Sequence, residues 1–433
     1  MKLSSIGRGL FVVFLTATLV AFQIFPPEQD SHVILVDSEA TSVHRVFFPI
    51  LLLVGLALLR PQSLKSALNV AYDMKWVLLT LAYFLACLVA FNQFGAPLNR
   101  LMLQAFIVCS VVVLAARIGD IDEIIRLSAI SGALVVALSY LAVASGEGIH
   151  QLEQVGAWRG NFPHKNQAGG AIVLAVLFMI AHSRLHATGV LRLFWYSLVA
   201  SGVFLLWMSE SKTAIALLVP SLIFGFLLNR LGSKPKTLPV ARAIVLVVFF
   251  AAVLFPWYSA DVLSWFDIYT SFTGRDLIWN LSMYLGWQQP VFGYGYESFF
   301  SGAGASIFLQ EAPTEFHQAI GHAHNGYINV FVQGGIFSML LLTLALLSPA
   351  FQLLKYESRA RPISIYLHAL WFLIIWRDVF EGDFFNGYRS PWVAFLIFAA
   401  CCSLAARGTA SQKSADADTF APAAHIPTPS AAL

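Results

Sequence analysis

The residues with the clearest capacity for chemistry lie at one junction near position 324. The sequence Gly321-His322-Ala323-His324-Asn325 closes a polar stretch and is followed at once by an apolar run. It places two of the 11 histidines of the chain two residues apart, beside an amide. An imidazole that is neutral near pH 7 accepts a proton from a hydroxyl group. We therefore predict that His324 is a general base, supported by His322 and Asn325.

Two other interpretations of the histidine pair remain open. A His-x-His pair can chelate a metal ion, and Glu315 and His317 are the nearest further ligands in the sequence. A structural or catalytic zinc site needs three or four well-placed protein ligands, and the sequence shows no obvious set. The pair is equally compatible with a purely structural role. We predict no metal site and no cofactor.

Basic residues in segments that precede apolar runs are candidates for binding an anion. Arg159 and Lys165 flank a turn with glycine and proline, which let the backbone bend tightly and approach a ligand. A predicted helix starts at Gln167, and Lys212 precedes another, so free backbone N–H groups would point the same way. The alternatives are that Arg159 and Lys165 anchor the chain at a membrane interface and that Lys212 belongs to an ordinary turn.

Arg275 and Arg377 complete this set of cations. Segment 273–276 approximates a helix N-terminal capping sequence and puts Arg275 in the first turn, where the helix dipole disfavours a cation. A phosphate bound jointly by the guanidinium and the backbone N–H groups would explain the placement, and a surface pair with Asp276 is the alternative. Arg377 either joins the anion site or pairs with Asp378. Farther along, the tyrosines and phenylalanines of 290–299 predict an aromatic turn that lines a groove.

The elements that must position these residues are membrane helices. The chain has 433 residues, is 58% hydrophobic and only 11% charged, and has a mean hydropathy of +0.73. Soluble domains carry about 25% charged residues, and runs of about 20 apolar residues indicate membrane spans. The fold class is therefore an all-α polytopic membrane protein with about 12 transmembrane helices. The expected spans are Arg8–Phe25, Val46–Leu59, Trp76–Phe91, Leu101–Ala116, Leu127–Ala144, Gln167–His182, Leu193–Trp207, Thr213–Leu228, Ala243–Pro256, Tyr327–Leu347, Ile363–Phe380 and Trp392–Ala406.

Charge asymmetry between the loops predicts the orientation. Most of the 26 lysines and arginines fall in the loops and tails on the side of the N-terminus, which should be cytoplasmic. Residues 1–407 then form the membrane domain, with a large outer loop at 258–324 between the ninth and tenth spans. Residues 408–433 are rich in Ala, Ser, Thr and Pro and predict a disordered cytoplasmic tail. A net charge of +3 gives no indication of nucleic-acid binding, and the four cysteines lack metal-ligand spacing.

Taken in order, three of these stretches resemble motifs of the O-antigen ligase and polymerase superfamily, which includes exopolysaccharide polymerases. The stretches are Trp158–Phe162 with 164–166; 274–279 followed by Pro290 and Gly293-x-Gly295; and His324-Asn325 followed, after nine residues, by Gly335. The plan of the spans and the late outer loop agree, so the resemblance covers most of the chain. Ser338 and Met339 stand where ligases often have threonines, which favours the exopolysaccharide polymerase branch.

The resemblance implies a metal-independent, inverting glycosyltransferase in the bacterial inner membrane. Its partners would be a polyprenyl-pyrophosphate-linked oligosaccharide, an acceptor glycan or glycolipid, and the lipid bilayer. The transfer would take place at the periplasmic face. Arg159 and Arg275 would bind the pyrophosphate, with Lys165, Lys212 and Arg377 as further candidates. His324 would activate the acceptor hydroxyl.

The competing hypothesis is a transporter such as a lipid-linked oligosaccharide flippase. Transporters of this kind tend to show internal repeats and ionisable groups near the middle of the membrane. This sequence shows no clear repeat, and its notable charges stand at the outer ends of predicted spans. We therefore favour an enzyme, and a pocket at the outer face that joins Arg159, Arg275 and His324 would distinguish it from a transporter.

Overall fold

The computed structural model describes residues 3–19, 40–59, 61–150, 155–264, 275–300, 308, 310, 322–356, 362–386 and 389–419. Within these residues every regular element is an α-helix, which confirms the predicted fold class. The helices are α1 (Leu3–Leu19), α2 (Ala40–Ala57), α3 (Pro61–Asp73), α4 (Lys75–Ala90), α5 (Ala96–Ile118), α6 (Ile121–Ala144), α7 (Lys165–Leu185), α8 (Gly189–Met208), α9 (Lys212–Gly232), α10 (Leu238–Ser264), α11 (Arg275–Gly286), α13 (Gly326–Tyr356), α14 (Ile363–Arg377) and α15 (Ser390–Thr419).

Most of these helices suit a membrane. Among the described residues, eight are long and apolar enough to cross a bilayer, or nine if the bent pair formed by α3 and α4 counts as one span. Shorter apolar helices cover Ile6–Leu19, Val46–Ala57 and Ile363–Arg377. The chain is thus a multi-pass membrane protein, while the number of twelve spans and the place of the large outer loop stay predictions.

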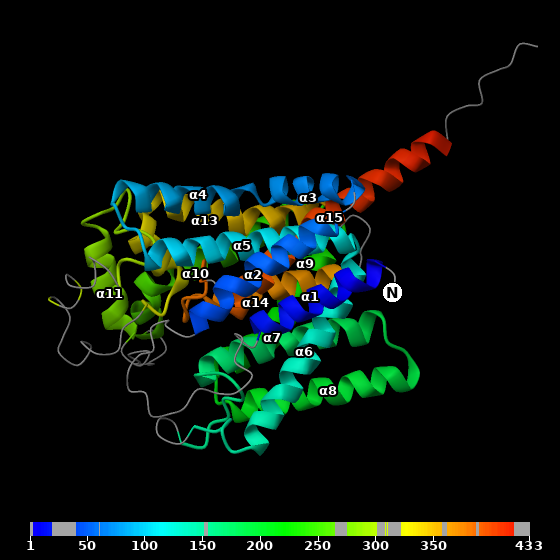
Figure 1. Cartoon of the computed structure of the whole chain (residues 1–433), viewed down its shortest axis with the longest axis horizontal. Coiled ribbons are helices and arrows are strands. Elements are labelled where there is room, and N and C mark those ends of the chain that lie inside the picture. The colour runs from blue at the N-terminus through cyan, green and yellow to red at the C-terminus, as the bar shows by residue number, and fades with distance from the viewer. Residues whose placement is uncertain are drawn as a thin grey trace, which may run out of the picture.

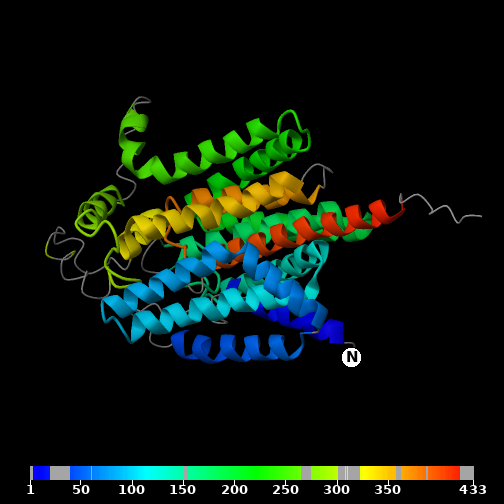
Figure 2. The ribbon, with the colours of Figure 1, turned by 90° about the horizontal axis from the view of Figure 1, so that it is seen from above.

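The long helices run in roughly the same direction, so the molecule has two distinct ends (Figures 1 and 2). The N-terminus lies at one end, near the place where α15 leaves the bundle. Helix α11 and the segment before α13 lie at the opposite end. We call this second end, where α7, α11, α13 and α15 begin and α14 finishes, the site end. Its position agrees with the predicted side of the functional loops.

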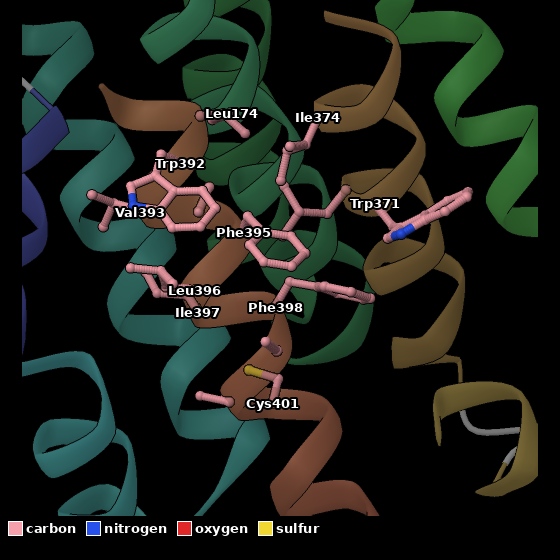
Figure 3. Close-up of a cluster of buried hydrophobic side chains, with 14 of the residues drawn as sticks. Leu174, Trp371, Ile374, Trp392, Val393, Phe395, Leu396, Ile397, Phe398 and Cys401 are labelled. Atoms are coloured by element: carbon pink, nitrogen blue, oxygen red, sulfur yellow. The ribbon is translucent and has the colours of Figure 1, made fainter. Parts of the chain in front are cut away.

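Helix α15 forms the centre of the bundle. It is apolar on all faces, and a helix of that kind must be buried. Its side chains Trp392, Phe395 and Phe398 pack against Leu174 of α7 and Trp371 of α14 (Figure 3). The indole N–H of Trp392 donates to Gln104 Oε1 of α5 at 2.9 Å, and that of Trp371 donates to the carbonyl of Leu346 at 2.9 Å. Buried indoles need such acceptors, so the first bond ties α15 to α5 and the second ties α14 to α13.

Helix α13 is broken at Gly335, which has φ +65° and ψ −159°. The break frees backbone groups, and segment 290–295 satisfies them. Ile336 N donates to the carbonyl of Pro290 at 2.7 Å, and Tyr294 N donates to the carbonyl of Val332 at 2.8 Å. A side chain at Gly335 would collide with backbone oxygen atoms of this segment. The glycine therefore fixes the first half of α13 against the site end.

The structure differs from the sequence-based expectations in three places. Two members of the aromatic turn are core residues: Tyr296 and Phe299 are each 1% exposed, because segment 290–299 docks onto the break in α13, whereas Phe292 stays exposed. The sequence of 119–126 is compatible with a short amphipathic segment at the interface, but residues 121–126 are the first turns of α6, capped by Asp120. Helix α15 continues to Thr419, past the predicted start of the tail at Gly408, as the alanines and lysine there favour. Residues 420–433 lie outside the described part.

Candidate functional site

The junction before α13 is held by two asparagines. Asn325 is fully buried; its Oδ1 accepts from Ile328 N at 3.0 Å, and its Nδ2 donates to the carbonyl of Val379 at 2.8 Å. Asn325 thus caps α13 and ties it to the segment after α14. One turn along, Asn329 Oδ1 accepts from Ala323 N at 2.8 Å. These contacts fix the backbone that carries the histidines, while the supporting role of Asn325 in catalysis stays a prediction.

The two histidines fold back onto each other. His324 adopts a left-handed backbone conformation with φ +50°, which is uncommon outside glycine and asparagine. Its N–H donates to Nδ1 of His322 at 3.1 Å, and the ring centroids are 4.1 Å apart. Because Nδ1 of His322 accepts a hydrogen bond, a neutral His322 carries its proton on Nε2. His322 therefore orients His324.

One ring nitrogen of His324 is left without a hydrogen-bond partner. Its Nδ1 is buried and has no hydrogen-bond partner. Burial lowers the pKa of His324 to about 3, with further lowering by Arg275, Arg389 and His164. Burial also lowers the pKa of His322 well below its usual value. Both imidazoles are therefore neutral near pH 7, and His324 can accept a proton.

Arg275 is the first residue of α11 and lies close enough to affect both histidines electrostatically. Its Nη2 donates to Glu381 Oε1 at 3.3 Å, and its side chain is 15% exposed. The partner is thus a residue of the segment after α14, whereas the sequence had suggested Asp276. The capping residue expected at Thr273 lies outside the described residues. The structure brings Arg275 to the histidines, as the phosphate hypothesis requires.

Arg377 is the last residue of α14 and is only 2% exposed. Its Nε donates to Asp383 Oδ2 at 3.0 Å, and its Nη2 donates to the carbonyl of Asn166 at 2.9 Å. The guanidinium also packs on Gly170, where a Cβ atom would come within 2.6 Å of Nη2. Arg377 therefore pairs with Asp383 instead of Asp378, and it links α14 to the start of α7.

Arg159 is 4% exposed and is held by its own loop. Nη2 and Nε donate to the carbonyl of Glu147 at 3.1 and 3.3 Å, and Nη1 donates to that of Pro163 at 3.5 Å. Burial lowers its pKa. These guanidinium bonds therefore run to carbonyl oxygens of the segment between α6 and α7. It reaches the site through His150, whose ring lies 5.7 Å from that of His164.

The two lysines predicted to bind the anion lie farther out. Lys165 opens α7, and its Nζ lies 3.8 Å from Glu210 Oε2. Lys212 opens α9 and is exposed to solvent. The structure does not bring either one into contact with the histidine pair in the part of the chain that it describes. Their contact with a substrate stays a prediction.

Arg389 and His164 also belong to the site, although the sequence did not identify them as candidates. Both act electrostatically on His322 and His324. His164 stands in one of the motif stretches, and its Nδ1 caps α7 by accepting from Asn166 N at 3.2 Å. Arg389 is one of the few cations on the outer side, which is the signal that would have identified it.

No group of three or more His, Cys, Asp or Glu side chains placed to hold a metal ion occurs among the residues that the structure describes. Glu315 and His317, the ligands considered with the histidine pair, lie outside those residues. The described part of the site is instead a set of neutral imidazoles among arginines. It suits proton transfer beside a bound anion.

The fold and this arrangement define a multi-pass membrane protein with a charged, histidine-containing site at one end of its helices. Comparison with known proteins shows what the chain is similar to. Residues 169–343 match the family model described as O-antigen ligase. The chain is also 25% identical, over 317 residues, to the exopolysaccharide production protein ExoQ of Rhizobium meliloti (strain 1021). That match covers 70% of this chain and 72% of the relative. Both findings confirm the resemblance to the O-antigen ligase and polymerase superfamily.

Proposed function

We propose that the protein is a membrane glycosyltransferase of polysaccharide biosynthesis, a polymerase or ligase. It transfers a glycan from a polyprenyl-pyrophosphate carrier to a hydroxyl group of an acceptor glycan or glycolipid. The observation that carries this proposal is the free, buried Nδ1 of His324 beside Arg275. The match to the O-antigen ligase family model and the similarity to an exopolysaccharide production protein support glycan transfer as the class of chemistry.

The proposed reaction is a single displacement. The acceptor oxygen attacks the anomeric carbon of the donor sugar, and the bond from that carbon to the pyrophosphate oxygen breaks. Nδ1 of His324 takes the hydroxyl proton. Polyprenyl pyrophosphate leaves with the electron pair, and Arg275 stabilises its charge. Attack from the side opposite the leaving group inverts the anomeric carbon, and the step uses no metal ion.

Substrate binding would also improve the base. Arg275 and Arg389 contribute to the low pKa of His324, because a nearby cation disfavours a protonated imidazole. A bound pyrophosphate would offset that positive field. The pKa of His324 would then rise toward the range in which an imidazole is an efficient base. The imidazolium that forms during transfer would be stabilised by the departing anion.

Other candidate residues take supporting places in this proposal. Arg377 stabilises the site end through Asp383 and the start of α7. Arg159 holds the loop that carries His164. A direct contact of Arg159, Lys165 or Lys212 with pyrophosphate stays a prediction. His322 and Asn325 keep His324 in its left-handed conformation.

The distribution of buried charge supports an enzyme over a transporter. Among the described residues the buried arginines and carboxylates are Arg159, Arg377, Asp378, Glu381 and Asp383. All five stand at the site end, outside the helices or at their last residue. A carrier that moves a charged glycolipid across the membrane would favour ionisable groups halfway along its helices. We infer that the protein lies in the bacterial inner membrane with this end in the periplasm.

The experiment that tests the proposal is complementation of a deletion strain with His324→Ala. Polymer is measured together with lipid-linked repeat units and with the amount of the variant in the membrane. We expect normal membrane abundance, loss of polymer, and repeat units accumulating on the outer side. Wild-type polymer from an abundant variant would exclude His324 as the base and would favour the transport hypothesis. An abundant Lys355→Gln variant, at the opposite end of α13, serves as the control.

A further inference from the structure

A small cleft opens at the site end between the first turns of α7 and α15. Arg377, Arg389 and Asp383 contribute its charged groups, and Gln167 and Ser390 belong to the first turns of the two helices. The cleft lies beside the histidine site, because Arg389 acts electrostatically on both His322 and His324. No function assigned above uses its interior.

Two guanidinium groups in this cleft keep N–H donors without partners. Arg377 is 2% exposed, and while its Nε and Nη2 are bonded, its Nη1 is buried and has no hydrogen-bond partner. The Nε of Arg389 is also buried without a partner. Leaving a buried charged donor unpaired is costly, so two such donors in one cleft indicate an acceptor that binds there.

The ion pairs around the cleft leave Arg389 available. Asp383 bonds to Nε of Arg377 at 3.0 Å, and Glu381 pairs with Arg275 at 3.3 Å. In the described part of the chain Arg389 makes no ion pair. The first turns of α7 and α15 add the positive ends of two helix dipoles. The cleft is narrow, with about 10 Å³ open to a water-sized group, so it suits a single oxygen atom of an anion.

We propose that this cleft binds a phosphate group of the lipid-linked donor, with Arg389 and Nη1 of Arg377 as its ligands. The inference rests on the proposed function and adds a binding residue to it. Arg275 and Arg389 would then both hold the pyrophosphate beside His324. A planar guanidinium presents paired N–H donors to phosphate oxygens, which explains an arginine at this position.

The test measures binding by the purified full-length protein in lipid nanodiscs. Farnesyl pyrophosphate is the probe, farnesol shows the contribution of the isoprenoid alone, and inorganic pyrophosphate shows that of the free anion. The variants are Arg389→Gln and Arg389→Lys. The control is Arg100→Gln, which removes an arginine from the same end of the molecule, where it pairs with Glu297 at 3.0 Å. Dissociation constants and thermal unfolding are recorded for each protein.

We expect Arg389→Gln to weaken farnesyl pyrophosphate binding by about tenfold or more, the value of one lost charge-assisted hydrogen bond. Arg389→Lys should lose less, and Arg100→Gln should bind as the wild type does. Farnesol affinity should be the same in all four proteins. Inorganic pyrophosphate should bind more weakly than the lipid-linked probe and show the same order of variants.

Two results would overturn the inference in distinguishable ways. If the wild type binds farnesyl pyrophosphate and a folded Arg389→Gln binds it equally well, the cleft is not the phosphate site, and the proposed function stands. If the wild type binds farnesyl pyrophosphate no better than farnesol, the donor class itself is wrong and both proposals fail. Should Arg389→Gln fail to fold, unchanged affinity in Arg389→Lys would overturn the inference.

Discussion

Two segments at the same end of the molecule differ in how far the N–H groups of their buried arginines are hydrogen-bonded. In segment 145–164, between α6 and α7, Arg159 directs its guanidinium to carbonyl oxygens of its own loop. In segment 377–389, from the last residue of α14 to the start of α15, Arg377 and Arg389 keep buried N–H groups without partners. All three arginines precede or face the start of a helix. Burial of a cation therefore does not by itself indicate a binding site; the donors left over do.

The histidines show the same contrast. His150, in the first segment, has a pKa lowered by burial to about 4 and lies against His164. Burial lowers the pKa of His324 to about 3 together with Arg275 and Arg389, which come from elements far apart in the sequence. The first segment is held mainly by contacts between its own residues. The second completes a site that several helices build together.

The largest effect should come from removing the central ion pair of the second segment. Arg377→Ala leaves Asp383 buried without its partner, which costs about 3–5 kcal/mol of unfolding free energy. Thermal unfolding of the purified protein, together with its abundance in the membrane, measures the loss. The double variant with Asp383→Asn should recover part of it. An Arg377→Ala protein as stable as the wild type would show that this segment is held by other contacts.

A smaller loss of stability is expected in the first segment. Arg159→Gln removes hydrogen bonds to the carbonyls of Glu147 and Pro163 and should cost about 1–3 kcal/mol. The same unfolding measurement applies, with farnesyl pyrophosphate affinity recorded in parallel. If stability stays the same and affinity falls, Arg159 binds the substrate directly, and the contrast between the two segments breaks down.

Acidification should destabilise the protein through His150 of the first segment and through His324, which lies in the junction before α13. The pKa values of His150 and His324 are lowered to about 4 and about 3, below the unfolded value of 6.5. The unfolded state therefore binds more protons, so the stability is complete above pH 6.5 and is lost as the pH falls toward 4 and 3. At pH 5 each histidine accounts for a loss of at most about 2 kcal/mol of unfolding free energy, relative to the value above pH 6.5.

The variants His150→Asn and His324→Asn separate the two contributions, and asparagine tolerates the left-handed backbone at 324. Each should show a smaller fall in unfolding temperature between pH 7.5 and pH 5 than the wild type. Equal falls in all three proteins would assign the acid sensitivity to other groups.

The smallest effect belongs to the edge of the first segment. Lys165 lies 3.8 Å from a Glu210 side chain that is 63% exposed, and pairs of this kind contribute about 0–1 kcal/mol. Lys165→Gln should therefore leave the unfolding temperature nearly unchanged. Polymer production by this variant sharpens the comparison. Production that collapses at normal stability would make Lys165 a substrate contact despite its outer position.

Much of the architecture follows from the sequence alone. Long apolar runs predicted the helical membrane bundle because backbone groups in a bilayer must be satisfied within each segment. The His-Asn pair and Gly335 mark the two ends of one helical segment. Asn325 caps α13 at its start, and Gly335 ends the first half of that helix. The signature thus describes a short helix with defined ends. The sequence could likewise identify Arg275 from an arginine placed against the helix dipole.

Tertiary structure decided which of these residues meet. The sequence offered Asp276 for Arg275 and Asp378 for Arg377, the nearest carboxylates in each case, whereas the folded chain supplies Glu381 and Asp383. It also turned part of the aromatic segment 290–299 into the core and brought Arg389 to the histidines. Apolar periodicity determines that helices form and bury their faces. Which ends converge depends on packing between helices distant in the sequence, and only that convergence sets the charge around His324.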